Sequence, residues 1–287
     1  MKTNKFFIAL VSASLTLFTA CKKDEVATDP TEVSASEKLN GGDYSKSENL
    51  FSEAYQMVEM EAQKEPTLNG FTGTTGTPLV VRGACPAVTI TPTGNTFPKT
   101  LTLDYGTGCT TKLGKSVSGK ITAVFTGKIK QTGGSVTVTF QNFKYKGYTL
   151  GGTYKATFTS TMGSTAQITN GTIATPDGKN LTYSASFTIV QSEGVSTTFI
   201  THGEAGVLDD VYAISGSGSG TDQTAKTYTV TITTPLIKKL NCEWITTGVV
   251  EIKITGAATK KLDFGAGTCD NQATLMVGRF STPVTLP

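Results

Sequence analysis

Few side chains in this 287-residue chain have the types and spacing that catalysis requires. His202 is the single histidine, so a serine or cysteine nucleophile could use only that one imidazole as its base. Glycosidases need two carboxylates facing one cleft, and the only adjacent acids after residue 65 are Asp209 and Asp210. Neighbouring residues of a strand point to opposite faces, so these two would not serve one site there. We therefore expect no catalytic residues, no enzyme activity and no cofactor.

Metal ligands are also sparse. A calcium site needs several clustered oxygens, for which Asp209, Asp210 and Asp222 are weak candidates. No cysteine pair has Cys-x-x-Cys spacing, which together with the single histidine argues against structural zinc. Asp104 and Asp263 each precede an aromatic-Gly-x-Gly turn, where capping of neighbouring amides is favoured over cation binding. We expect no metal site.

One group of basic and aromatic residues could bind a ligand. If the segments around the Gly133-Gly134 turn form a hairpin, a patch of lysines and tyrosines should gather on it: Lys120, Lys144, Lys146, Tyr145 and Tyr148. Such a patch suits an acidic polysaccharide. Lysines on outer faces and edges also keep a sheet from pairing with other chains, and we favour that interpretation.

The N-terminus has the pattern of an export signal. Lys2 and Lys5 precede an apolar run that ends at Ala20 and is too short to anchor the chain by spanning a bilayer. The segment Leu17-Phe18-Thr19-Ala20-Cys21 resembles the lipobox of bacterial lipoproteins. The resemblance implies that residues 1–20 are removed and that Cys21 becomes a lipidated, palmitate-bearing first residue.

Two further features resemble secreted lipoproteins of the Bacteroidota type. Lys22, Lys23, Asp24 and Glu25 follow the cysteine and resemble the signal that sends those lipoproteins to the outer face of the outer membrane. The blocks around 85–109 and 263–271 are similar to those of uncharacterised β-rich lipoproteins. This resemblance implies the lipoprotein export machinery as a partner, and it implies no activity.

Four cysteines remain after Cys21: Cys85, Cys109, Cys242 and Cys269. An even number in an exported chain suggests two disulfides, for which three connectivities exist. The midpoint of 242–269 falls on the turn-like Thr255-Gly256, and that of 85–109 lies beside another turn-like segment. Residues equidistant from a hairpin turn face each other, so we predict Cys85–Cys109 and Cys242–Cys269.

Charge divides the chain into two parts. Five lysines and eleven acids lie between Cys21 and Glu65, whereas eighteen lysines or arginines and eleven acids follow. The basic residues are not concentrated in one run, so a nucleic-acid partner is not expected. Residues 21–43 are polar and predict a flexible tether that begins at the lipidated cysteine.

A helix is predicted over 44–66. Ser45 and Glu48 match a capping box, and Pro66 ends the pattern. Apolar residues recur at helical spacing and predict one buried stripe, with an acidic face opposite: Leu50, Phe51, Ala54, Tyr55, Val58 and Ala62.

The region 79–287 predicts an all-β domain. Apolar residues alternate with Thr, Ser and Lys, as in Tyr183, Ala185 and Phe187, which is typical of antiparallel strands that cover a core on one side. Glycine-containing turns separate the segments, and we include Gly216–Gly220 among them. We predict a long-stranded β-sandwich of hairpins, preceded by one short helix.

These features predict a lipid-anchored outer-membrane protein, displayed at the cell surface, that acts as a non-catalytic binding, adhesive or structural module. Its partners would be the membrane, through the lipid, and a glycan or protein ligand. Two alternatives stay open. One is a glycan-active or other hydrolase with an atypical site, and the other is a small-ligand carrier with a hollow β-barrel.

Overall fold

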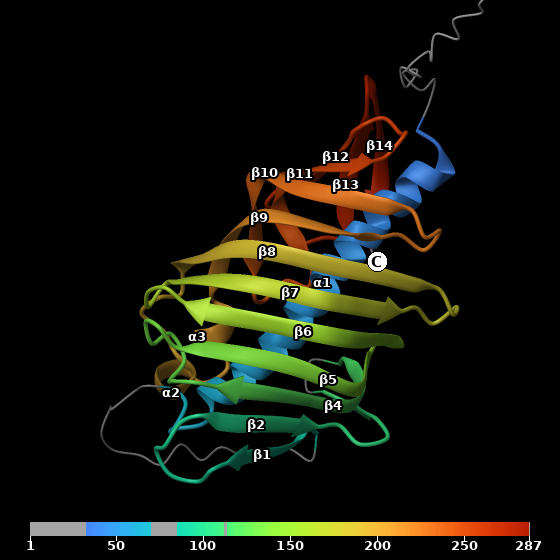
Figure 1. Cartoon of the computed structure of the whole chain (residues 1–287). Coiled ribbons are helices and arrows are strands. Elements are labelled where there is room, and N and C mark those ends of the chain that lie inside the picture. The colour runs from blue at the N-terminus through green and yellow to red at the C-terminus, as the bar shows by residue number, and fades with distance from the viewer. Residues whose placement is uncertain (1–32, 70–84, 112–113, 287) are drawn as a thin grey trace, which may run out of the picture.

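The computed structural model describes residues 33–69, 85–111 and 114–286. In this part of the chain, one long helix, α1 (Ala35–Gln63), lies against one face of a single antiparallel sheet (Figure 1). The predicted signal peptide, Cys21 and the Lys22–Glu25 motif lie outside the described residues. Within the described ranges, no helix is both long enough and apolar enough to cross a membrane.

The helix begins earlier than predicted. Its N-cap is Ser34, whose backbone amide donates to Glu37 Oε2 at 2.8 Å, while the Glu37 amide donates to Ser34 Oγ at 3.3 Å. This capping box stands eleven residues before the predicted one, so residues 35–43 belong to the helix and not to the tether. In the predicted capping box, Ser45 lies inside the helix and Glu48 instead accepts from the Tyr183 hydroxyl at 2.9 Å.

The sheet has fourteen strands in the described residues. In chain order they are β1 (Ala87–Thr91), β2 (Lys99–Asp104), β3 (Cys109–Thr110), β4 (Ser116–Phe125), β5 (Ser135–Tyr145), β6 (Tyr148–Phe158), β7 (Gly163–Ala174), β8 (Asn180–Glu193), β9 (Val211–Thr221), β10 (Thr227–Lys239), β11 (Ile245–Ile254), β12 (Lys260–Ala266), β13 (Gln272–Val277) and β14 (Phe280–Thr285). Two short helices, α2 (Phe199–His202) and α3 (Ala205–Leu208), lie between β8 and β9.

Strands adjacent in the sequence are adjacent in the sheet, so the topology is a meander from β1 to β14, with β3 paired to β4. The antiparallel all-β character of 85–286 is therefore as predicted. Neither the two stacked sheets of a sandwich nor one short preceding helix is confirmed, because α1 has 29 residues and α2 and α3 lie within the β region. The sheet is continuous, and α1 supplies the second layer of the core (Figure 1).

The sheet bends around the helix. The burial of residues on every side of α1 shows this. Phe51 is 0% exposed and Val58 is 1% exposed, and acidic residues opposite the apolar stripe are also buried, with Glu53 at 6% and Glu59 at 8%. Side chains from α1 reach elements far apart in the sheet, from Tyr105 after β2 to Leu240 after β10. The helix therefore buries its acidic face as well as the predicted apolar stripe.

Strand bulges accompany this curvature. The β4–β5 register shifts between Ser118 and Lys120, and Gly119 there has φ +78°. A Cβ at Gly119 would lie 2.1 Å from the Asn142 carbonyl oxygen, so only glycine fits. Such bulges bend a strand and increase its twist. They let a long sheet curl around one helix.

The glycine run Gly216–Gly220 was predicted to be a turn, but it lies inside β9. A Cβ at Gly218 would lie 3.2 Å from a ring carbon of Tyr183, and one at Gly220 would lie 2.8 Å from the Tyr228 hydroxyl. Tyr183 and Tyr228 are both 1% exposed. The glycines therefore leave room for two buried tyrosines between the sheet and α1.

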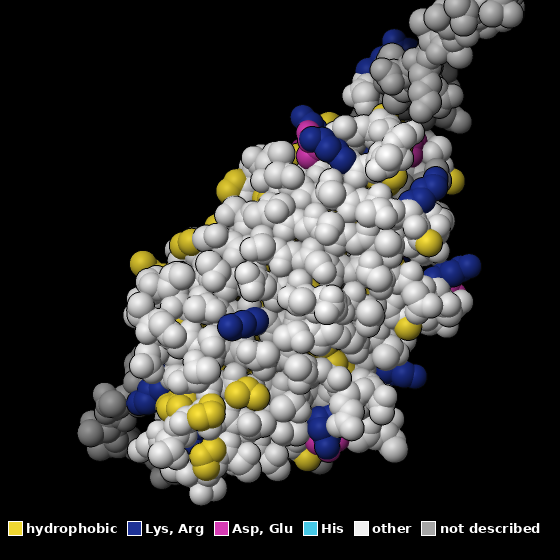
Figure 2. Space-filling model, viewed as in Figure 1, with side chains coloured by type: hydrophobic (Ala, Val, Ile, Leu, Met, Phe, Trp, Pro, Cys, Tyr) yellow, Lys and Arg dark blue, Asp and Glu magenta, His cyan; other side chains and the backbone are white. Residues whose placement is uncertain are grey.

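The outer face of the sheet is polar and has few charges (Figure 2). Six strands place threonines directly opposite one another across this face: Thr89, Thr102, Thr122, Thr139, Thr153 and Thr169. Opposed threonines support strand pairing through their methyl and hydroxyl groups. The alternation seen in the sequence is confirmed along β8, where Tyr183, Ala185 and Phe187 are buried.

Both predicted disulfides are present, Cys85–Cys109 and Cys242–Cys269. The second closes the β11–β12 hairpin, in which Val250 pairs with Leu262 about the predicted turn. The two bridges tie hairpins near opposite ends of the sheet.

Candidate functional site

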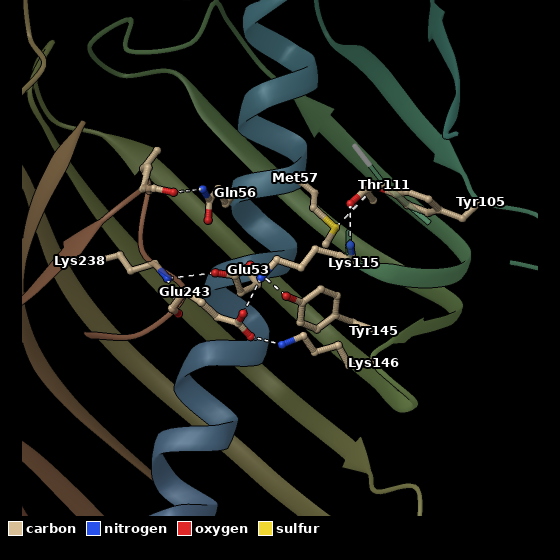
Figure 3. Close-up of polar contacts among 11 residues, drawn as sticks. Glu53, Gln56, Met57, Tyr105, Thr111, Lys115, Tyr145, Lys146, Lys238 and Glu243 are labelled. Atoms are coloured by element: carbon tan, nitrogen blue, oxygen red, sulfur yellow. Dashed lines mark hydrogen bonds and ion pairs between the residues drawn. The ribbon is translucent and has the colours of Figure 1, made fainter. Parts of the chain in front are cut away.

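A buried ion cluster holds the middle of α1 to the sheet (Figure 3). Glu53 Oε1 accepts from Lys238 Nζ of β10 at 2.9 Å. Its Oε2 accepts from the Tyr145 hydroxyl of β5 at 3.1 Å and lies 3.8 Å from Lys115 Nζ. Both Glu53 oxygens are thus satisfied, and its charge is matched by that of Lys238.

Glu243 completes this cluster from the loop after β10. Its carboxylate pairs with Lys115 at 2.7 Å and with Lys146, and its backbone carbonyl accepts from Lys238 Nζ at 2.7 Å. Desolvation raises the pKa of Glu243, but hydrogen bonds and charge from Lys115 and Lys146 outweigh that effect and lower it overall. The lowered pKa favours the ionised form of Glu243, and the acids and lysines of the cluster pair with one another, so we interpret the cluster as structural.

One turn further along the same polar side of α1, the environment changes. Residues at positions i, i+3, i+4 and i+7 of a helix share one face, and here Ser52, Tyr55, Gln56 and Glu59 face a cavity of about 70 Å³. We call it the Glu59 cavity. Its other walls come from β6 to β10 and the β6–β7 turn, including Tyr154, Phe158, Met162, Ile189, Tyr212, Ile214 and Leu240.

A larger space adjoins this cavity. An open groove of about 700 Å³, which we call the α2 groove, is lined by residues that include Gln63, Lys128, Val195, Phe199 and Ile200. Lys130, Thr161 and Gln191 line both spaces, so the Glu59 cavity and the α2 groove lie side by side.

Two of the three large exposed apolar side chains in the described residues line these spaces. Met162 lines the cavity and Val195 lines the groove, and each is about half exposed. The third, Val190, lies in β8 between the inward-facing Ile189 and Gln191, so its side chain points to the outer face of the sheet. Exposed hydrophobic residues that line a groove are typical of a binding site.

Glu59 has no cationic partner within the described residues. Among them, the only hydrogen bond to its carboxyl group comes from the Tyr212 hydroxyl, at 3.2 Å to Oε1. That hydroxyl lies closer to Asp210 Oδ2, at 2.9 Å, and has a single proton to donate. Glu59 therefore keeps unused hydrogen-bonding capacity at the cavity wall.

Asp210 is fully engaged by contrast. It is 1% exposed, its Oδ1 accepts from Gln191 Nε2 at 2.7 Å, and its Oδ2 lies 3.7 Å from Lys130 Nζ. Desolvation raises the pKa of Asp210 to about 6, against the opposing charge of Lys130. Asp210 does not line the Glu59 cavity, and its role there is to orient Tyr212, Gln191 and Lys130.

The predicted lysine and tyrosine patch does not form one surface. The hairpin β4–β5 is as predicted, but Lys120 pairs with Asp104 at 3.0 Å and Lys146 pairs with Glu243. Tyr145 points inward to Glu53, and Tyr148 lies under Lys46 of α1, whose Nζ is 5.4 Å from the ring centroid. Lys144 stays exposed on the outer side of β5.

The weak calcium candidates are also separated. Asp209 and Asp210 precede β9 and Asp222 follows it, so about ten strand residues, on the order of 35 Å, separate them. Asp222 Oδ1 instead accepts from the amides of Thr224 and Lys226. Among the described residues, no three acids, cysteines or histidines are placed to hold a metal.

The two predicted turn-capping acids and the single histidine are also placed by the structure. Asp104 and Asp263 each accept the amide of the second residue after them at 2.9 Å, which is the predicted turn capping. His202 is exposed in α2, and its ring nitrogen lies 2.8 Å from Thr201 Oγ1. It lies outside both the cavity and the groove.

Sequence reasoning missed Glu59, Tyr212 and Lys130. A signal existed in the charge division, since an acidic helix followed by a basic β region is what a buried, charge-paired helix requires. That division was interpreted only as evidence against nucleic acid. The residues come from α1, the β4–β5 loop and β9, so no local spacing joins them.

No protein-family model matches this chain, and neither a curated protein nor a solved structure does. Function is therefore inferred from the residues and their geometry alone.

Proposed function

We propose that this protein is a lipid-anchored cell-envelope module, displayed at the outer face of the outer membrane, that binds a small ligand without catalysis. The Glu59 cavity and the α2 groove beside it carry the binding part of the proposal. The lipobox-like segment that ends at Cys21 and the Lys22–Glu25 motif support the anchor and its facing.

Binding is favoured over hydrolysis by the arrangement of the acids. Glu59 and Asp210 share the Tyr212 hydroxyl and resemble a carboxyl pair. However, both Asp210 oxygens accept hydrogen bonds, and this residue does not face the cavity. A general acid or base must reach the proton that it transfers. Glu59 alone faces a bound molecule, which suits recognition.

The cavity part is tested by titrating small cationic, anionic and neutral fragments into the purified protein, α1 included, and following backbone NMR signals. Thr161 is exposed and lines both spaces, so Thr161→Trp should block them without disturbing the core. Thr139→Trp, on the outer face of β5, is the matched control. We expect at least one fragment class to shift signals of cavity residues, with loss in Thr161→Trp and retention in Thr139→Trp. Absence of any such fragment would contradict the binding proposal.

The anchor part is tested in cells by fatty-acid labelling and protease treatment. Cys21→Ser should remove the label and release the protein from the membrane fraction. Replacing Lys22, Lys23, Asp24 and Glu25 with alanine should keep the label while protecting the domain from protease added to intact cells. If the wild-type domain is already protected, the surface assignment is wrong.

A further inference from the structure

The chemical class of the ligand follows from the charges around the Glu59 cavity. Two lysines line it, but each already has an anionic partner: Lys130 pairs with Asp210 at 3.7 Å, and Lys238 pairs with Glu53 at 2.9 Å. Glu59 is 8% exposed and has no cationic partner among the described residues. The wall therefore presents one unmatched, nearly buried carboxylate, and buried charges are normally paired.

Aromatic residues line the same cavity as this carboxylate. Tyr55 and Tyr154 stack with centroids 4.7 Å apart, and Phe158 and Tyr212 line the same cavity. The faces of aromatic rings attract cations, and aromatic cages recognise quaternary ammonium groups. An anion would be repelled by Glu59, and a neutral molecule would leave its charge uncompensated.

Resting on the binding function proposed above, we infer that the Glu59 cavity takes the ammonium head of a small organic cation. Glu59 is its counter-ion, and the rings of Tyr55, Tyr154 and Tyr212 form its walls. Apolar substituents of the head pack on Met162, Ile214 and Leu240.

The size of the cavity limits the ligand further. An apolar cavity of about 150 Å³ accommodates benzene, whereas the Glu59 cavity is about 70 Å³. It therefore encloses only a compact head group, and a trimethylammonium head, which is close to benzene in size, projects in part from the open side of the cavity. A longer ligand extends past Thr161 into the α2 groove, where Val195, Phe199 and Ile200 offer apolar contacts.

The test compares two probes of the same shape by titration calorimetry. Choline carries a trimethylammonium head, and 3,3-dimethyl-1-butanol replaces its nitrogen with carbon and is neutral. We expect wild-type protein to bind choline at least tenfold more tightly than the alcohol. Glu59→Gln should abolish that preference. Glu61→Gln should keep it, because Glu61 lies on the same helix, pairs with Lys64 at 2.6 Å and does not line the cavity.

Each result decides one point. Equal binding of both probes to wild-type protein, lost in Thr161→Trp, would overturn the cation while the binding function stands. Binding of benzoate in the cavity in preference to choline would do the same. If neither these probes nor the fragment classes above bind, the binding function itself fails. If Glu59→Gln does not fold, Tyr154→Leu replaces it, and unchanged choline preference in that variant overturns the aromatic walls.

Discussion

Glu53 and Glu59 lie six residues apart on one helix and are both nearly buried, yet their surroundings differ completely. Glu53 has a lysine and a tyrosine on its two oxygens and lines neither the Glu59 cavity nor the α2 groove (Figure 3). Glu59 shares one tyrosine hydroxyl with a competing carboxylate and faces a cavity. Burial of a charge therefore does not by itself indicate function. The informative feature is whether the chain supplies the partner.

The largest expected effect is on stability at Glu53. Glu53→Ala leaves Lys238 buried without its anion, and removal of one partner from a buried pair costs about 3 to 5 kcal/mol. Glu61→Ala, which breaks a partly exposed pair on the same helix, should cost about 0 to 1 kcal/mol. Denaturant unfolding measures both. Equal costs would show that the Glu53 cluster does not stabilise the fold.

The Cys242–Cys269 disulfide should contribute nearly as much. It closes a loop of 27 residues, which corresponds to about 3.5 kcal/mol on the chain-entropy model. Because Cys242 adjoins Glu243, replacing both cysteines with alanine should also loosen the Glu53 cluster. Replacing Cys85 and Cys109 with alanine opens a loop of similar length without touching that cluster, so this change should lower the free energy of unfolding by less. If it lowers that free energy by more than the change at Cys242 and Cys269 does, the Cys242–Cys269 disulfide does not support the Glu53 cluster.

A third acid of α1, Glu48, predicts a pH effect. Desolvation raises its pKa to about 7, although the Tyr183 hydroxyl opposes the shift. Between about pH 4.5 and 7 the folded state then binds more protons at Glu48 than the unfolded state does. Stability therefore falls as pH rises through this window. Glu48→Gln should remove this slope. Across the whole window, the contribution of Glu48 to the free energy of unfolding changes by about 3 kcal/mol at most. An unchanged slope in the variant would show that Glu48 is ionised in the folded protein.

The smallest stability effect is expected at Glu59. Glu59→Gln leaves no buried cation unpaired, and the amide oxygen can still accept from Tyr212. The free energy of unfolding should change by no more than about 1 kcal/mol. A loss as large as that of Glu53→Ala would mean that Glu59 is structural, and the contrast between the two acids would disappear.

Much of the fold could be predicted from local patterns. Alternation in β8, the β4–β5 hairpin and both disulfides depend on residues near each other in sequence. The sequence does not show that the second layer is a helix and not a second sheet, because the inward face of that helix carries Glu48, Glu53 and Glu59. Acidic residues in a helix indicate a solvent-exposed face unless their buried partners are known. The Gly216–Gly220 run was misinterpreted for a related reason, since its glycines accommodate Tyr183 and Tyr228 from other strands.

The candidate site was less predictable than the fold. The lysine patch around Tyr145 was proposed from neighbours on one hairpin, but a strand alternates its faces, so Tyr145 turned inward. The Glu59 cavity is assembled from α1, β6, β8, β9 and β10. Its defining feature is an acid without a cationic partner. This feature arises because Lys130 pairs with Asp210 and Lys238 pairs with Glu53 in the folded structure.

The most direct test is the melting-temperature shift caused by choline in three proteins. A ligand that binds only the folded state raises the melting temperature by mass action. We predict a shift for wild-type protein, the same shift for Glu61→Gln, and no shift for Glu59→Gln from a nearly unchanged starting temperature. An equal shift in Glu59→Gln and wild-type protein would contradict the assignment of Glu59 to the ligand.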